Sequence, residues 1–129
     1  MNELNNTATA EGQYNSIPTS LTSNTSVVTM IEGLTLTKTA DKQNWSSGTL
    51  TYTIVLNNQT NTAYENPSIV DIIDTDLVDF VENSVTINEV TATSSEYTYN
   101  NDNHTLKVTL KEVLANSSST IKFQVKKKS

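Results

Sequence analysis

The chain has 129 residues, eight of them Lys and none of them Arg or Cys, and its formal net charge is -6. This length suits one domain whose core needs no metal or disulfide to stabilise it. An acidic chain without Arg repels a phosphate backbone, which disfavours nucleic-acid binding. Without Cys, neither a disulfide framework nor a Cys-based zinc site can form. We expect no cofactor, and no membrane insertion, because no apolar stretch is long enough to span a bilayer.

Residues 1–32 are predicted to be an extension that is separate from a domain at 33–129. The N-terminus MNELNNTATAEG lacks the basic and then apolar layout of a signal peptide. We expect a short strand at 6–10, a polar loop through Pro18 and a second strand at 26–31. The β-branched and apolar residues of this second strand do not fit a disordered tail.

Apolar and polar residues alternate with a period of two along 33–129, and helical periodicity is absent almost everywhere. Asn-rich segments at 57–61 and 99–104 supply turn chemistry between the apolar runs. The pattern therefore predicts an all-β fold, and seven short strands suit an immunoglobulin-like two-sheet sandwich with Greek-key connections. The predicted strands are 34–38, 49–57, 68–74, 84–90, 95–99, 105–111 and 119–127.

Four motifs, at 36–41, 48–58, 69–77 and 119–125, occur in one order along the domain. Together they resemble the conserved immunoglobulin-like repeat, catalogued as a domain of unknown function, that occurs in tandem in bacterial surface proteins. The chain departs from that family at Gln59, where a Gly usually follows the Asn, and after Leu77, where the family has Pro. The resemblance implies an extracellular domain at a bacterial cell surface or spore surface.

The end of the chain departs from the family in a more informative way. In the resembling repeats, the Phe-x-Val strand is followed by an Asn-Thr-Ala-x-Val strand and a final strand, whereas this chain stops at 126–129. The absent strands are similar to segments at the N-terminus of the same chain. The candidate donor positions are Asn6, Thr7, Ala8, Thr9, Ala10, Val27, Val28, Met30 and Ile31.

A sandwich without its last strands exposes an open sheet edge and an apolar strip, and a matching strand from outside would cover both. The N-terminal segment could fold back into its own domain, or it could enter the next copy by strand addition. We favour the second closure, because in the tandem family the end strand of one repeat belongs to a different domain from the strand that follows. Head-to-tail contacts of this kind propagate into open filaments.

Lys38 is a candidate nucleophile because strand parity places it on the apolar face of Leu34 and Leu36. Burial on that face favours the neutral amine. The resembling surface adhesins and pilins use such a lysine to form an amide with an Asn side chain, assisted by a protonated carboxyl group. The candidate carboxyl groups are Asp74 and, as a second choice, Asp71, and the candidate acceptors are Asn6 and, as a second choice, Asn58.

Simpler interpretations of the same residues stay open. Lys38 can extend to the sheet edge and pair there with an Asp. An acidic stretch could hold Ca²⁺, but it lacks an Asp-x-Asp-x-Asp-Gly loop, so we expect a solvated rim and no metal site. The stretch comprises Asp71, Asp74, Asp76, Asp79 and Glu82.

Histidine and aromatic residues suggest no catalytic site. His104 is expected in a turn, where no motif supplies a nucleophile for it to activate. Trp45, Tyr64, Tyr97 and Tyr99 could form a sugar-stacking face, although Trp45 is expected at one end of the sandwich. We expect no enzyme, because no nucleophile–base pair, metal site or phosphate loop is present.

The sequence therefore predicts a structural subunit of a bacterial surface or spore-appendage fibre, whose partner is another copy of itself. The alternative is a stalk or adhesin module excised from a tandem-repeat surface protein, with a host or glycan ligand that the sequence does not identify. The absence of an evident leader together with Met1 favours release by mother-cell lysis, as for spore appendages.

Overall fold

The computed structural model describes residues 2–30 and 32–128. These residues form two compact units, and the boundary falls between Glu32 and Gly33. All strand pairs among the described residues are antiparallel, which makes the protein all-β, as the period-two alternation predicts. None of the described residues belongs to a helix long and apolar enough to cross a membrane.

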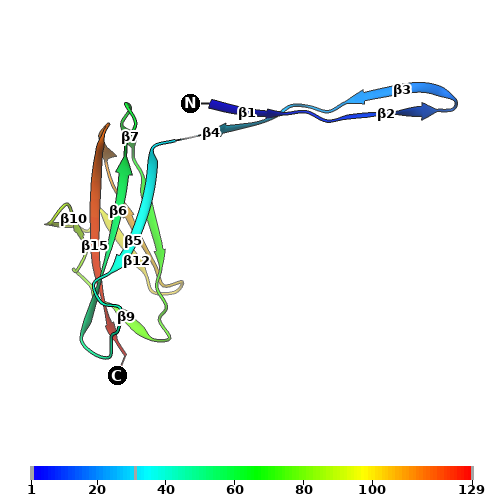
Figure 1. Cartoon of the computed structure of the whole chain (residues 1–129). Helices are drawn as coiled ribbons and strands as arrows, with labels where there is room; N and C mark the ends of the chain where they lie inside the picture. Colours follow the sequence, from blue (N-terminus) through cyan, green and yellow to red (C-terminus); the bar gives the residue numbers. More distant parts are fainter. Residues whose placement is uncertain (1, 31, 129) are drawn as a thin grey trace. The chain divides into compact units, whose positions relative to one another are not determined.

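The first unit is an antiparallel ribbon made of two successive two-stranded sheets (Figure 1). Its strands pair as β1 (Asn2–Asn6) with β4 (Ser26–Met30), and β2 (Thr9–Tyr14) with β3 (Ile17–Thr22). We call β1 and β2 together the first strand of the ribbon, and β3 and β4 together its second strand. Asn15 and Ser16 at the tip of the ribbon have φ angles of 52° and 64°, the left-handed values that a two-residue turn of type I′ requires. Every side chain of the ribbon whose exposure is described is exposed, so these side chains form no core of their own.

Two expectations for this region are wrong. The strand expected at 6–10 is divided between β1 and β2, because residues 7–8 face three residues, 23–25, where the ribbon has a bulge. The polar loop expected through Pro18 is instead the hairpin of β2 and β3, in which Pro18 pairs with Gln13. A proline is tolerated in such a strand when its missing N–H falls on the free edge.

The larger unit begins at Gly33 and is built on a six-stranded antiparallel sheet. β6 and β15 are its longest strands and pair along almost their whole length, and β5 lies on the other side of β6 as an edge strand (Figure 1). The six strands are β5 (Leu34–Ala40), β6 (Thr49–Asn58), β9 (Val78–Phe80), β10 (Thr86–Ile87), β11 (Val90–Thr91) and β15 (Ser117–Lys127).

Two smaller sheets complete this unit. A three-stranded sheet has the order β12-β13-β8, so β8 forms one of its edges, and β7 pairs with β14 in a separate two-stranded sheet. These strands are β7 (Tyr64–Glu65), β8 (Ser68–Ile72), β12 (Tyr97–Asn100), β13 (Thr105–Thr109) and β14 (Glu112–Val113).

The two larger sheets contribute to one hydrophobic core. Ile121, Phe123 and Val125 alternate along β15 with residues that face away, and all three are 0% exposed. Leu106 and Val108 of β13 pack in the same core. Burying a side chain of this size stabilises the fold by about 1.5–3 kcal/mol, so alternate residues of both sheets hold the unit together.

Most of the strands predicted for 33–129 are present with shifted ends. The stretch at 84–90, expected to be one strand, is instead β10 and β11 joined by Asn88 and Glu89. The φ angles of these two residues are 49° and 69°, so a turn interrupts the predicted strand. The hairpin chemistry predicted at 99–104 is confirmed, because β12 and β13 pair across that turn.

Candidate functional site

Lys38 and Asp71 form an ion pair between two edge strands of different sheets. Lys38 Nζ on β5 lies 2.7 Å from Asp71 Oδ2 on β8. The Asp71 side chain is 9% exposed, whereas the Lys38 side chain is 43% exposed. The Asp71 carboxylate is therefore held inside the protein, whereas the Lys38 amine is accessible from solvent at the edge of β5.

Two aromatic rings lie beneath this ammonium group. Lys38 Nζ is 4.5 Å from the centroid of the Tyr52 ring and 5.9 Å from that of Phe123. These rings also contact each other, with centroids 5.4 Å apart. Lys38 thus lies on the core-facing side of β5, where the parity of Leu34 and Leu36 places it, and cation–π attraction adds to the ion pair.

The ion pair lies in the wall of a cavity of about 360 Å³. Trp45 is in the same wall, and its Nε1 atom is buried without a hydrogen-bond partner among the described residues. A buried unpaired donor is uncommon in folded proteins. Leu36, the neighbour of Lys38 on the inner side of β5, is 58% exposed, so this part of the sheet is not covered by the described strands of the larger unit.

An amine beside a buried carboxyl group can form an amide with a carboxamide side chain. Chemically, the carboxyl group polarises the amide carbonyl and transfers protons, the amine attacks the carbonyl carbon, and ammonia leaves. The cavity supplies the amine and the carboxyl group, but no Asn or Gln is among the described residues that line it. A carboxamide would therefore have to enter from elsewhere.

The preferred carboxyl candidate, Asp74, lies just beyond β8 and is exposed. It lines the same cavity, but its Oδ1 accepts the Asp76 backbone N–H at 3.1 Å. The structure brings Lys38 to Asp71, the second choice, and no ion pair joins Lys38 to Asp74 among the described residues. Asp74 is placed to stabilise a turn.

Asn58, the second candidate acceptor, is 0% exposed at the end of β6. Its Nδ2 donates to the Val113 carbonyl at 3.0 Å, and its Oδ1 accepts the Thr60 backbone N–H at 2.9 Å. In the register of β5 and β6, Asn58 is opposite Leu34, whereas Lys38 is opposite Ile54. This separation of four residues, about 13 Å of strand, makes Asn58 a structural residue distant from the amine.

Asn6, the preferred acceptor, ends β1 and pairs with Ser26 in the ribbon. The other predicted donor residues also lie in or between the ribbon strands, except Ile31, which is outside the described residues. Thr7 and Ala8 lie at the bulge, Thr9 and Ala10 in β2, and Val27, Val28 and Met30 in β4.

The acidic stretch forms no evident metal site. Among residues 2–30 and 32–128, no three His, Asp or Glu side chains gather closely enough to hold a metal ion. Asp71 is paired with Lys38, and Asp79 lies 3.9 Å from Lys128.

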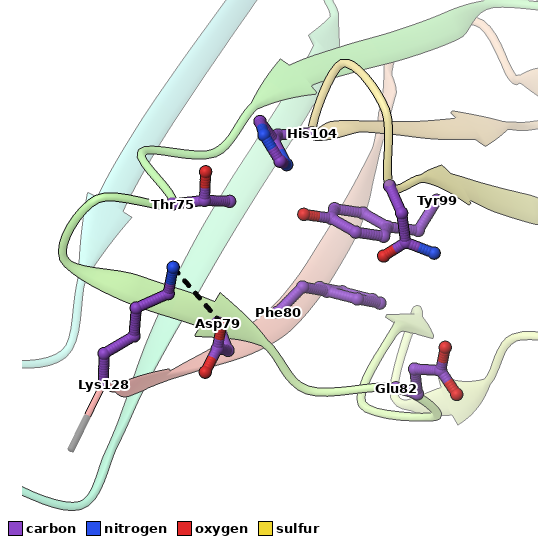
Figure 2. A pocket seen from close by; sticks show the side chains of 8 residues that line it. Thr75, Asp79, Phe80, Glu82, Tyr99, His104 and Lys128 are labelled. Carbon is purple, nitrogen blue, oxygen red and sulfur yellow. Dashed lines mark ion pairs between the residues drawn. The ribbon is translucent and has the colours of Figure 1, made fainter.

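A second, polar hollow of about 180 Å³ lies between Tyr99, Asp79 and His104 (Figure 2). The Tyr99 ring stacks on Phe80 with centroids 4.6 Å apart. Burial, and secondarily the charge of Asp79, raises the pKa of Tyr99 above its ordinary value of 10.0. The sequence suggests Tyr97 and Tyr99 as parts of one stacking face but does not place Phe80 beside them. The position of Phe80 depends on the pairing of β9 with β15, which are far apart in the sequence.

Comparisons with protein-family models, curated proteins and solved structures found no significant match to this chain. The fold is that of an all-β chain with many antiparallel strands.

Proposed function

We propose that this protein is a structural subunit of an extracellular fibre on a bacterial cell or spore surface. Each copy joins the next head to tail when its N-terminal ribbon completes the larger unit of a neighbour. In this proposal the larger unit is an immunoglobulin-like sandwich with an uncovered sheet edge, and the ribbon of a neighbouring copy covers that edge.

The observation that carries the proposal is the Lys38–Asp71 pair in an uncovered edge. The amine and the carboxylate are 2.7 Å apart, aromatic rings support the amine, and the cavity beside them lacks a carboxamide among its described lining residues. A simple ion pair needs no cavity next to it. The arrangement is what an incomplete amide-forming site would have.

The covalent step joins Lys38 of one copy to Asn6 of another. Asp71, once it has taken the proton from Lys38, is a neutral acid that donates a hydrogen bond to the Asn6 carbonyl. The Lys38 nitrogen forms a bond to Cγ of Asn6, the bond from Cγ to Nδ2 breaks, and Nδ2 leaves as ammonia with protons relayed by Asp71. The step occurs once per joint, needs no oxidant or cofactor, and is not turnover.

The ribbon supports the proposal because its described side chains form no core. A two-stranded ribbon alone is marginally stable in water, yet here it carries exposed Tyr14, Ile17 and Leu21. The larger unit meanwhile exposes Leu36 and the edge of β8. Apolar surface on both units would be covered by one contact between copies.

Light scattering during size-exclusion chromatography, with negative-stain microscopy of the same fractions, tests the proposal. We expect filaments whose length increases with protein concentration, and a compact monomer when residues 1–32 are deleted. Circular dichroism of the deleted chain controls for folding. A full chain that stays monomeric at every concentration would contradict the fibre and favour a stalk module excised from a longer surface protein.

A further inference from the structure

β8 has one edge with which no described strand pairs. The N–H of Ile73 donates to the His104 carbonyl on the β13 side, so the odd-numbered residues of this antiparallel ladder bond to β13. The backbone groups of Ser68, Val70 and Ile72 therefore point to the free edge. Such an edge is a template for another strand.

The ribbon has one apolar face. Its register places Ala10 opposite Leu21 and Tyr14 opposite Ile17, and residues paired in this way share a face. Tyr14, Ile17 and Leu21 are 72%, 63% and 66% exposed, so this face is uncovered. Asn6, Ala10 and Tyr14 are even-numbered residues of the first ribbon strand, so their side chains point to the same face. The carboxamide of Asn6 therefore lies on the apolar face.

Backbone hydrogen bonds fix the direction in which the ribbon can pair with β8. Ser23 N–H donates to the Ala8 carbonyl at 2.9 Å, so even-numbered residues of the first strand bond within the ribbon and odd-numbered ones point to its free edge. At the free edge of β8, the unpaired N–H and C=O groups therefore belong to residues whose side chains point away from the core. At the free edge of the first ribbon strand, they belong to residues whose side chains point away from the apolar face. In an antiparallel pair, two residues that are hydrogen-bonded to each other have their side chains on the same face of the sheet, whereas in a parallel pair they do not. If the apolar face of the ribbon turns toward the core, the first ribbon strand must therefore pair antiparallel with β8.

The first strand of the ribbon is the one that can pair. Pro18 is one residue beyond the Tyr14–Ile17 pair that flanks the turn, so its backbone nitrogen faces the free edge of β3. Because proline has no N–H, a continuous ladder cannot form on that edge. Residues 2–14 contain no proline, which leaves the edge of β1 and β2 available.

One register brings the reacting groups together. With Asn6 opposite Asp71, Leu4 is opposite Ile73 on the inner face, and Thr7 is opposite Val70 on the outer face. Side chains directly opposite in an antiparallel pair have Cβ atoms about 4.5–5.5 Å apart. Asn6 would then contact the carboxyl group that already lies 2.7 Å from Lys38 Nζ.

β5 and β8 run in the same direction. Leu34 begins β5 and pairs with Asn58, whose side chain donates to the carbonyl of Val113 in β14. β14 pairs with β7, which immediately precedes β8 in the chain. Both strands therefore begin at the same end of the unit, and farther along them Lys38 meets Asp71.

This direction decides whose ribbon is used. In the proposed register, the second ribbon strand also runs with β8, because it is antiparallel to the first. Met30 would lie four residues beyond the level of Asp71, whereas Leu34 lies four residues before Lys38. Along the strand direction, Met30 and Leu34 would thus be eight residues apart, or about 26 Å. The four-residue link from Met30 to Leu34 can span at most about 14 Å. The ribbon must come from another copy.

We propose that the ribbon of one copy adds both of its strands to the three-stranded sheet of another. Its first strand pairs antiparallel with β8, and Asn6 is opposite Asp71. This inference rests on the proposed function and names the receiving strand, the donated strand and the register.

Engineered cysteines test the register, since these 129 residues include no Cys. A Lys38→Arg background removes the amine nucleophile, so only a disulfide can link the copies. Thr7→Cys with Val70→Cys places the thiols on directly opposite residues, whose Cα separation of about 5.5 Å suits a disulfide. The matched control is Ser20→Cys with Val70→Cys, which would link only if β3 were the paired strand.

We expect a reducible ladder of oligomers on denaturing gels for the Thr7–Val70 pair and monomer for the Ser20–Val70 pair. Filaments of the Thr7–Val70 variant that dissolve to monomer without reductant would overturn the register and leave the fibre proposal intact. A ladder only in the Ser20–Val70 variant would show that the second strand is paired. Absence of filaments from the unaltered chain would instead refute the proposed function itself.

Discussion

Lys38 and Asp71 belong to different sheets, yet their charged atoms lie 2.7 Å apart. The pair links the two edge strands β5 and β8 at the place where the larger unit is uncovered. Because the Lys38 side chain is 43% exposed, the pair alone contributes little to stability, on the order of 1 kcal/mol or less. The proposed amide chemistry would account for its position at an open edge better than stability does.

Lys38→Arg is expected to leave assembly intact and to abolish the covalent link. The guanidinium keeps the positive charge beside Asp71 but stays protonated and cannot act as a nucleophile. Fibres of the unaltered chain should resist boiling in detergent, with a mass loss of about 17 Da for each ammonia released. Fibres of the variant should dissolve to monomers of full mass, as intact-mass spectrometry would show.

Asp71→Asn is expected to slow amide formation by at least about 100-fold, the usual contribution of a positioned acid–base group. Asp74→Asn is the matched control, because Asp74 lines the same cavity but bonds to its own turn. Time courses of detergent-resistant oligomers would separate the two variants. Equal rates for Asp71→Asn and the unaltered chain would remove Asp71 from the mechanism.

Asn58→Ala is expected to destabilise the larger unit by at least about 2 kcal/mol, because it leaves the Thr60 N–H and Val113 carbonyl without their partner. Asn61→Ala, at an exposed position nearby, should have an effect near zero. Thermal unfolding of both variants in the Lys38→Arg background measures this without a covalent link. Loss of the mass change in a folded Asn58→Ala variant that still forms filaments would show instead that Asn58 is the acceptor.

Stability is expected to fall as the pH rises above about 10, because Tyr99 has a raised pKa in the folded protein. The unfolded chain loses the phenol proton near the ordinary value of 10.0, whereas the folded protein holds it to higher pH. The stabilising contribution is present below that value and is lost as the pH rises through the folded pKa. Tyr99→Phe should flatten this part of the melting-temperature profile, and an unchanged slope would contradict the assignment.

The strand pattern of the larger unit could be predicted because its core residues alternate, as Ile121, Phe123 and Val125 do. The side of β5 on which Lys38 lies followed from the same alternation. The partner of Lys38 could not be predicted from this alternation, because the stretch 68–74 has apolar residues on both faces. Periodicity alone could not tell that Asp71 faces inward while Val70 and Ile72 are exposed.

The ribbon was predicted only in part, for a different physical reason. Polar Thr, Ser and Gln side chains on its outer face resemble a loop in composition, and Pro18 argues against a strand unless its nitrogen lies on a free edge. The turn at Asn15 and Ser16 carries no glycine. A two-residue Asn-Ser turn between Tyr14 and Ile17 was the available signal for the hairpin.

Isotope mixing measures most directly whether one copy completes another. Chains labelled with heavy nitrogen and unlabelled chains would be unfolded, mixed, assembled and digested, and peptides joining Lys38 to Asn6 would be analysed by mass spectrometry. Joining between copies predicts that peptides with one heavy and one light half are as abundant as the uniformly labelled ones together. Joined peptides with both halves always of one label would mean that each ribbon closes its own chain, and would contradict the fibre.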